Sequence, residues 1–320
     1  MNNIFIFIIL SLLLSLAVDL SVGEVPALIH PVVLIGNMTN CLKKIFININ
    51  NKFSGLFVVV IETCFSSVLI YLLCLFLSFN VYLLFIVYTI LLSTTFSVKM
   101  LLKTAQDVKQ DLDVSIDKAR ESVSYLVSRD TKELTEAFIV SATIESLTEN
   151  ITDSYTAVVF YYLIFALLLP DWLFLPLLVA FLYRISNTLD AMLGYKTDEL
   201  INIGFIPAKI DDVLNFIPSR LSGLFIVFAS YLLKYNWKNA YKVMMRDAGN
   251  CPSPNSGYTM APTAGALDIQ LVKKDTYVLG DDLNEITKDD ITRAVKLTKM
   301  TLFLFTVFSI SIFSVIFAIT

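Results

Sequence analysis

The sequence predicts an all-α fold, a multi-pass membrane protein of helices with a polar helical cap. The charged fraction of 16% lies well below the roughly 25% of soluble domains, and the mean hydropathy is +0.72. Strongly apolar segments of membrane-spanning length alternate with dense polar clusters. No internal repeat or Gly/Ser linker divides the chain, so one integral membrane domain over residues 1–320 is expected.

Composition also excludes several classes of function. The net charge of -4 and the lack of a Lys/Arg tract argue against nucleic acid and against a polybasic lipid-binding patch. Cys41, Cys64, Cys74 and Cys251 show neither CxxC nor CxxH spacing. We interpret them as small apolar residues and not as disulfide or zinc ligands.

The predicted apolar segments are residues 4–18, 55–79, 81–98, 155–183, 217–233 and 301–319. The first lacks a preceding basic residue and a convincing cleavage site, which favours a retained helix over a removed signal peptide. The second and third are separated by a very short turn at Asn80. At about 1.5 Å per residue, each can cross a hydrocarbon core of roughly 30 Å.

The segment 155–183 is interrupted by Pro170-Asp171, and each half alone is too short to cross. The segment is therefore expected to be either one kinked span or a shallow re-entrant hairpin. The loops 19–54 and 99–154 carry most of the early Lys and Arg, and the turn at Asn80 carries none, which places those loops in the cytoplasm and the turn outside. A full crossing then puts Asn187 outside, whereas a hairpin keeps it inside. We favour the hairpin, which gives the polar clusters one cytoplasmic face.

The polar region 99–154 is expected to be helical. Charged and apolar residues recur at helical spacing through Lys103, Val108, Leu112, Ile116, Ala119 and Val123, which predicts an amphipathic hairpin on the membrane surface. Simple solvation is the alternative explanation of its charged face.

Acidic and amide residues form the first candidate metal cluster. Glu145, Glu149 and Asp153 follow at i, i+4 and i+8, with Asn150 beside them and no Lys or Arg among them. Carboxylates at that spacing repel unless a cation such as Mg²⁺ lies between them. An acidic face exposed to solvent is the alternative.

Asn187 and Asp190 repeat this pattern at i, i+3 beside a membrane-length apolar run, with helix capping as the alternative. Lys209, Asp212 and Arg220 form a mixed cluster of cations and carboxylates that suits a phosphate with its metal.

Two further polar features could contribute to a site. Arg246 precedes the turn-rich stretch from Ser253 through Asn255, whose Pro and Gly residues would fix a backbone near a ligand or form an ordinary loop. His30, the sole histidine, lies just after the first apolar segment and could equally be an interfacial histidine.

The ordered set of these motifs resembles the membrane-bound adenosylcobinamide-phosphate synthases of cobalamin biosynthesis, the CobD/CbiB family. The resemblance runs from about Asp19 to Gly280. It is carried by His30-Pro31 with Gly36, Arg129-Asp130-Thr131, Glu145-Ser146 with Glu149-Asn150 and Asp153, Asn187-Thr188-Leu189-Asp190 with Gly194-Tyr195-Lys196, Asp211-Asp212 with Pro218 and Arg220-Leu221, and Ser253-Pro254-Asn255 with Gly257 and Ala264-Gly265-Ala266. Two positions depart from the family pattern: Lys209 stands where Arg is expected, and Cys251 stands near where many relatives carry His.

The resemblance implies a multi-pass enzyme of the cell membrane that joins aminopropanol or its phosphate to adenosylcobyric acid in an ATP-dependent amide ligation. The corrinoid, the amine and membrane lipid are the expected partners, together with other late enzymes of the pathway. ATP and Mg²⁺ are the implied cofactors, although the chain has no Walker A motif.

The resemblance also suggests roles for individual residues. The implied metal ligands are Glu145, Glu149, Asn150, Asp153, Asn187 and Asp190. The implied substrate and phosphate ligands are Arg129, Asp130, Lys196, Lys209, Arg246, Ser253 and Asn255. The implied catalytic residues are His30, Asp212 and Arg220, with His30 or Asp212 taking the amine proton and Arg220 holding developing charge.

Two other classes of function remain open from the residues alone. A membrane prenyltransferase holds Mg²⁺-diphosphate with Asp/Asn clusters, but several apolar segments here are short for the lipid-open cavity it needs. A transporter would place charges within its spans. The apolar segments hold few such residues, chiefly Glu62 and Asp171. The exact amine and the oligomeric state are not predicted.

Overall fold

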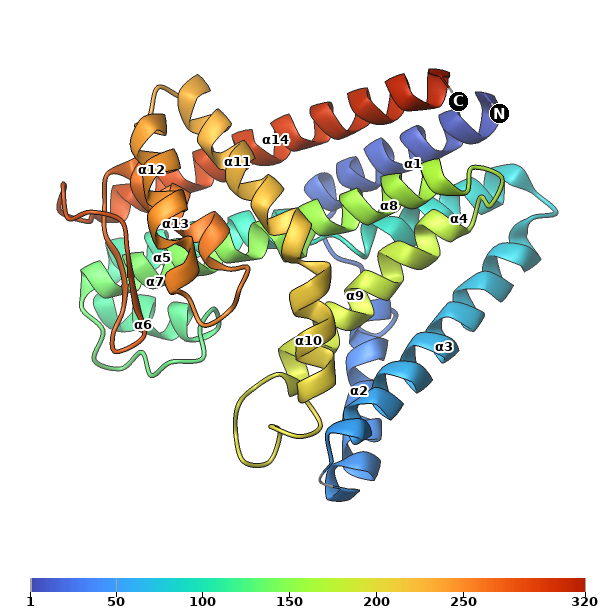
Figure 1. The fold of residues 1–320 in the computed structure, drawn as a ribbon, viewed down its shortest axis with the longest axis horizontal. Helices are drawn as coiled ribbons and strands as arrows, with labels where there is room; N and C mark the ends of the chain where they lie inside the picture. The colour runs from blue at the N-terminus through green and yellow to red at the C-terminus, as the bar shows by residue number, and fades with distance from the viewer. Residues whose placement is uncertain (1, 50, 320) are drawn as a thin grey trace. The chain divides into compact units, whose positions relative to one another are not determined.

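The computed structural model describes residues 2–49 and 51–319. Helices dominate the described residues, which confirms the all-α prediction (Figure 1). The α-helices are α1 (Asn2–Ser21), α2 (Pro31–Phe46), α3 (Lys52–Leu77), α4 (Val81–Ser93), α5 (Val98–Val114), α6 (Ile116–Ser124), α7 (Glu136–Ile151), α8 (Ala157–Leu168), α9 (Leu175–Leu193), α10 (Phe205–Leu214), α11 (Phe216–Leu232), α12 (Trp237–Asp247), α13 (Gly257–Leu267) and α14 (Lys288–Ile319). Short turns η1 (Ile47–Ile49), η2 (Thr152–Thr156) and η3 (Ala248–Asn250) and an antiparallel hairpin of β1 (Leu271–Lys273) and β2 (Tyr277–Leu279) complete the elements.

Six helices among the described residues are long and apolar enough to cross a membrane, which confirms a multi-pass membrane protein. They are Asn3–Ser21, Pro31–Ile49, Lys52–Leu77, Val81–Val114, Glu136–Leu168 and Lys288–Ile319. The pair α10 and α11 adds a seventh if both count as one span. The sequence prediction missed Pro31–Ile49, because Asn, Thr and Lys side chains interrupt its apolar residues.

The chain divides into two compact units, each assembled from separate stretches. Unit 1 comprises the residues up to Ser97, Ala157–Leu214 and the residues from Ser309 onward, and unit 2 comprises Val98–Thr156 and Asn215–Phe308. Neither unit is a contiguous stretch of sequence, and the expected single-domain organisation stays a prediction.

In unit 1 the chain turns back at Pro170-Asp171. Helices α8 and α9 lie side by side, and the residues between them form the turn (Figure 1). The expectation that the first half of this segment is too short to cross is wrong, because its helix begins at Glu136 and not near residue 155. Tyr162 ties α8 to α1 by donating to the Ile8 carbonyl oxygen at 3.1 Å.

Unit 1 also contains a buried acid within a candidate span. The Glu62 side chain in α3 is 0% exposed. Thr39 in α2 lies within hydrogen-bonding distance of both its carboxyl oxygens, at 2.9 and 3.0 Å. Glu62 therefore belongs to the α2–α3 contact and does not lie at an exposed interface position.

Unit 2 is built around α7. Its small apolar core joins Val108, Ala119, Val123, Ile139 and Ala142, with Leu112 packed against it. The predicted amphipathic pattern of α5 and α6 is thereby confirmed at these positions, whereas the predicted apolar position Ile116 is 38% exposed. The prediction that the whole region 99–154 lies on a surface is wrong for α7, most of whose side chains are buried. Small Ser, Thr and Ala side chains allow this close packing.

Helix α13 packs tightly against α11 in unit 2. A Cβ atom at Gly223 in α11 would lie 2.3 Å from the Tyr258 carbonyl oxygen of α13. Only glycine permits this approach. The contact fixes the segment that carries Ser253 and Asn255 beside α11.

Candidate functional site

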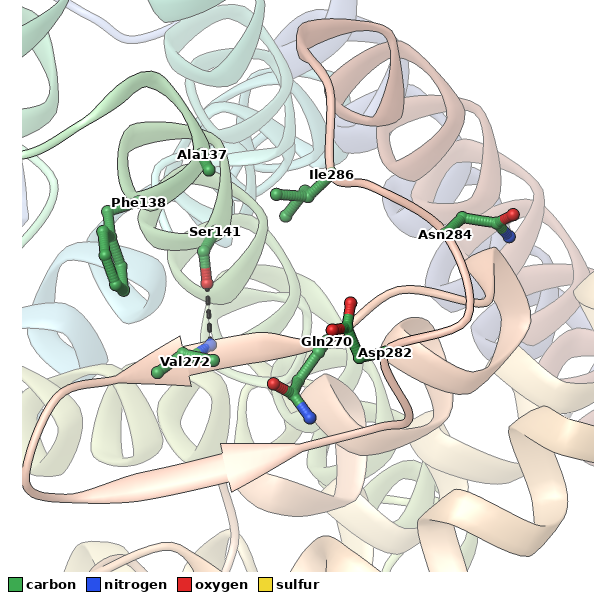
Figure 2. Close-up of a pocket in the computed structure, with 8 residues that line it drawn as sticks. All are labelled: Ala137, Phe138, Ser141, Gln270, Val272, Asp282, Asn284 and Ile286. Carbon is green, nitrogen blue, oxygen red and sulfur yellow. Dashed lines mark hydrogen bonds between the residues drawn. The ribbon is translucent and has the colours of Figure 1, made fainter.

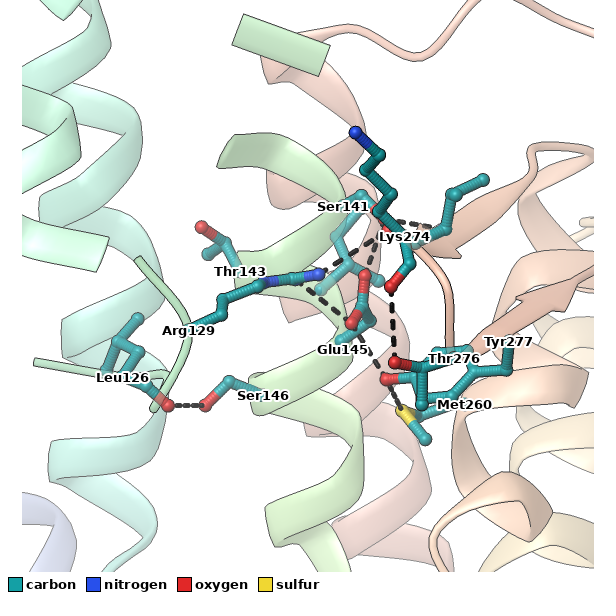
Figure 3. A network of polar contacts seen from close by, with 12 residues as sticks. Leu126, Arg129, Ser141, Thr143, Glu145, Ser146, Met260, Lys274, Thr276 and Tyr277 are labelled. Carbon is teal, nitrogen blue, oxygen red and sulfur yellow. Dashed lines mark hydrogen bonds and ion pairs between the residues drawn. The ribbon is translucent and has the colours of Figure 1, made fainter. Parts of the chain in front are cut away.

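A buried carboxylate, Glu145 of α7, is the centre of the polar network in unit 2. Arg129 lies with Nη2 3.1 Å from Glu145 Oε2, and the Tyr277 hydroxyl donates to the same oxygen at 2.8 Å. The Ser141 hydroxyl donates to Oε1 at 2.6 Å. Figure 3 shows these side chains converging from α7, the loop after α6 and the β-hairpin. Both carboxylate oxygens are thus held by donors from three segments.

Burial makes this network electrostatically strong. The Glu145 and Arg129 side chains are 5% and 17% exposed, respectively. Low local polarity strengthens their attraction and makes an unpaired member costly. Burial, followed by the charge of Glu145, raises the pKa of Tyr277, so its hydroxyl stays protonated and donates. Tyr277 and Ser141 were not predicted as site residues.

A cavity of about 160 Å³ adjoins this network. Its lining includes Ser141 from α7, Val272 from β1 and the polar side chains Gln270, Asp282 and Asn284 (Figure 2). Ser141 also accepts a hydrogen bond from the Val272 backbone N–H at 2.9 Å. Since Ser141 contacts both Glu145 and the cavity wall, the two features are structurally joined.

The acidic row predicted along α7 is not regular. Glu145 is buried, Glu149 is exposed, and Asn150 and Asp153 are half-buried. A π-helical turn begins at Thr152, so Asp153 lies outside the regular α-helical geometry that relates Glu145 to Glu149. No group of three or more His, Cys, Asp or Glu side chains within 2–49 and 51–319 is arranged to hold a metal ion. The predicted metal roles therefore stay predictions.

A second polar group in unit 2 surrounds Arg220 of α11. Its guanidinium carbon lies 3.6 Å from the Phe216 ring centre and 4.0 Å from that of Tyr258. Arg220 donates to Asn255 Oδ1 at 3.2 Å. Ser253 accepts a hydrogen bond from the Asn255 backbone N–H at 3.2 Å and so shapes the loop. The structure thus brings together Arg220, Ser253 and Asn255.

Arg246 forms ion pairs with two carboxylates. It lies 2.6 Å from Asp247 and 2.7 Å from Asp281. Burial alone raises the pKa of Asp247, but hydrogen bonds from Arg246 and the Gly280 N–H outweigh it and hold that pKa below its usual value. This arrangement fastens α12 to the loop after β2. These contacts use three of the five guanidinium N–H groups of Arg246, whose side chain is 42% exposed.

Two further predicted positions in unit 2 are now located. Asp130 is exposed and accepts a hydrogen bond from the Lys132 backbone N–H at 3.1 Å, as in a turn. Burial raises the pKa of Cys251 to about 11, so its side chain is a protonated thiol.

In unit 1, the predicted residues lie on α9, α10 and the loop between them. Arg184 donates to Asn187 Oδ1 at 3.2 Å, and Gly194 donates its N–H to the Asp190 carbonyl oxygen at 2.7 Å. Lys196 is exposed in the loop after α9. Lys209 and Asp212 form an i, i+3 pair at 3.2 Å, which by its exposure contributes little to stability.

His30 caps the N-terminus of α2 in unit 1. Its Nδ1 accepts the Val32 backbone N–H at 3.2 Å, and the residue is 6% exposed. Burial, opposed by the negative charge of Glu24 and assisted by the positive charge of Arg184, lowers the pKa of His30. The imidazole is therefore held neutral near pH 7.

The predicted site residues thus fall into two groups, one in each unit. Unit 1 holds His30, Asn187, Asp190, Lys196, Lys209 and Asp212, and unit 2 holds Arg129, Asp130, Glu145, Glu149, Asn150, Asp153, Arg220, Arg246, Ser253 and Asn255. The β-branched and aromatic residues that flank the polar turn at 273–275 are a sequence signal for the hairpin that carries Tyr277.

Comparison with known proteins identifies relatives along most of the chain. The family described as CobD/Cbib protein matches residues 12–298. "Probable cobalamin biosynthesis protein CobD" of Methanothermobacter thermautotrophicus is 43% identical over 306 residues, covering 95% of this chain and 98% of the relative. The protein of the same name from Methanocaldococcus jannaschii is 36% identical over 285 residues, covering 87% of this chain and 90% of the relative.

A bacterial relative gives the same result. "Cobalamin biosynthesis protein CobD" of Leptospira interrogans is 33% identical over 313 residues, covering 94% of this chain and 96% of the relative. No solved structure matches the chain significantly. With the family match extending through both units of a multi-pass helical membrane protein, the chain belongs to the CobD/CbiB family.

Proposed function

We propose that this protein acts in cobalamin biosynthesis as an ATP-dependent amide ligase that joins aminopropanol or its phosphate to adenosylcobyric acid. The main support for this proposal is the family match over residues 12–298, together with relatives named for cobalamin biosynthesis. The substrates are therefore a corrinoid carboxylic acid and a small amine. The proposed location is the cell membrane, in line with the six candidate spans.

Cationic and amide side chains in unit 2 support binding of anionic substrates. The guanidinium of Arg220 is stacked between two rings and oriented by Asn255. A planar guanidinium fixed in this way suits a carboxylate or phosphate. We assign Arg220 to binding and stabilising negative charge, with Ser253 and Asn255 shaping its surroundings.

The residues at the end of α7 fit a magnesium–nucleotide complex. Mg²⁺ carried by ATP phosphates needs only one or two protein carboxylates. Glu149 is exposed, and Asn150 donates its amide N–H to the Ser146 carbonyl oxygen at 2.8 Å, which directs Oδ1 away from that carbonyl. We assign the magnesium contact to Glu149, Asn150 and Asp153, while Glu145 orients Arg129. ATP would supply the phosphoryl group that activates the carboxylic acid toward the amine.

A base must accept the proton that the attacking amine loses. Asp212 is a half-buried carboxylate paired with Lys209. We assign the role of base to Asp212 and not to His30.

Genetic rescue tests the proposal. A strain that lacks this amide-forming step, supplied with cobyric acid, should regain cobalamin synthesis when it expresses this chain. Glu149→Gln should abolish rescue without loss of membrane-inserted protein, because it removes a metal-binding charge. Glu133→Gln, in an exposed loop of the same unit, is the matched control and should rescue fully. Full rescue by Glu149→Gln would contradict the metal assignment, and failure of the unaltered chain would contradict the function.

A further inference from the structure

The orientation of His30 determines which ring nitrogen carries its proton. His30 Nδ1 accepts the Val32 N–H at the start of α2, so Nδ1 must be unprotonated. A neutral imidazole carries one N–H, which then lies on Nε2. The lowered pKa described above keeps the ring in this neutral form.

The Nε2–H group lacks an acceptor. The residue is 6% exposed, and Nε2 has no hydrogen-bond partner among residues 2–49 and 51–319. Buried donors are almost always paired in folded proteins, so an unpaired one suggests a site that a ligand completes.

The surroundings of His30 favour a negatively charged ligand. The α2 N-terminus, with no acidic residue in its first turn, presents the positive end of the helix dipole. The charge of Arg184 acts on the His30 ring. Glu24 opposes these charges, but its carboxylate accepts a hydrogen bond from Ser97 at 3.0 Å.

We propose that His30 donates its Nε2–H to a substrate oxyanion, a carboxylate or phosphate oxygen bound at the N-terminus of α2, and that His30 is not the base. This inference rests on the proposed function, whose substrates supply both kinds of oxyanion. As a base, Nε2 would have to be unprotonated, which moves the ring proton to Nδ1. That proton would then face the Val32 N–H and break the cap.

The single histidine makes a direct test possible. Protein carrying 15N-labelled histidine and a tag without histidine gives nuclear magnetic resonance signals from His30 alone. At rest the protonated nitrogen should be Nε2. Titration with inorganic phosphate and, separately, with cobyric acid should shift the Nε2–H signal with at least one of them. A proton on Nδ1, or no shift with either probe at saturation, would overturn the proposal.

Two substitutions separate the cap from the donor. His30→Asn keeps a side-chain acceptor for the α2 N-terminus and removes Nε2–H, whereas His30→Ala removes both. His30→Asn should retain the thermal stability of the unaltered protein and bind the responsive probe about 10- to 100-fold more weakly, as expected for a lost hydrogen bond to a charged group. Unchanged binding by a folded His30→Asn protein would contradict the donor role.

The two probes also separate this inference from the proposed function. A shift with phosphate, or loss of phosphate affinity in His30→Asn, supports the oxyanion site even where the rescue described above fails. Successful rescue together with an unresponsive His30 would leave the ligase proposal intact and overturn the donor role.

Discussion

At the scale of single residues, Glu145 shows how a buried charge is retained in unit 2. Its carboxylate is satisfied by Arg129, Tyr277 and Ser141. Such a group stabilises a structure only while every partner remains, because each missing partner leaves buried charge uncompensated. The network therefore holds the β-hairpin against α7.

Replacing Tyr277 by Phe should lower the free energy of unfolding by about 1–3 kcal/mol, since a buried carboxylate loses one donor. Denaturant-induced unfolding of the purified protein in detergent measures this change. Tyr125→Phe is the matched control, because the Tyr125 side chain is 81% exposed. Equal stability of both variants would contradict the structural importance of the Tyr277–Glu145 contact.

The pH dependence of stability should reveal Asp247. Its pKa in the folded protein lies below the ordinary value of 3.8. Its ionised form therefore stabilises the fold above that value, and this contribution is lost as pH falls through the lower folded pKa. Asp247→Asn should consequently show a smaller drop in thermal unfolding temperature between about pH 5 and pH 3 than the unaltered protein. Identical drops would argue against this pairing.

The residue-scale predictions from sequence had a clear physical limit. Proximity along the chain correctly grouped Lys209 with Asp212, although Arg220 of the same predicted cluster belongs to the other unit. Proximity could not relate Glu145 to Tyr277, which is 132 positions away and reaches it only through the fold. Spacing also could not foresee the π-helical turn that displaces Asp153 from the regular row.

At the scale of elements, close packing of α11 and α13 positions the Arg220 group. Gly223→Ala should disturb this contact, because the added Cβ would lie 2.3 Å from a backbone carbonyl oxygen. The expected result is a loss of roughly 1–3 kcal/mol in unfolding free energy from overpacking, together with weakened rescue. Gly249→Ala is the control, since its added Cβ meets nothing within 4 Å. Equal effects of the two changes would exclude this explanation.

The sequence predicted which segments form helices better than it predicted which helices are buried. Apolar periodicity identified α5 and α6 through Val108, Leu112, Ala119 and Val123, which the core of unit 2 confirms. The same composition rules placed α7 on a surface, although Ser, Thr and Ala residues bury it. Small polar side chains that hydrogen-bond within their own helix are compatible with close packing, which hydropathy does not express.

At the scale of the whole molecule, hydropathy predicted a multi-pass protein but missed the candidate span Pro31–Ile49 and the division into two units. The division into units depends on contacts between distant stretches of sequence, whereas the missed span is a helix whose polar side chains lower its hydropathy. The candidate span Pro31–Ile49 divides the loop 19–54, so this loop no longer supports the positive-inside argument as one cytoplasmic segment. The cytoplasmic location of the Asn187 cluster stays a prediction that labelling can test.

Membrane sidedness should differ between two exposed positions of unit 1. In a background without the exposed Cys41 and Cys64, Thr197→Cys should react with an impermeant thiol reagent only from the cytoplasmic side. Ser78→Cys, beside the Asn80 turn, should react only from the opposite side. Labelling of both from one side would contradict the predicted topology.

Reconstitution of the purified protein is the decisive test of ATP-dependent amide formation. Protein in liposomes receives adenosylcobyric acid, magnesium, and aminopropanol or its phosphate, with and without ATP, and corrinoid products are separated and identified by mass. We expect adenosylcobinamide or its phosphate, formed only with ATP and accompanied by release of ADP and phosphate. Amide product without ATP, or no product with any amine tested, would contradict the proposed function.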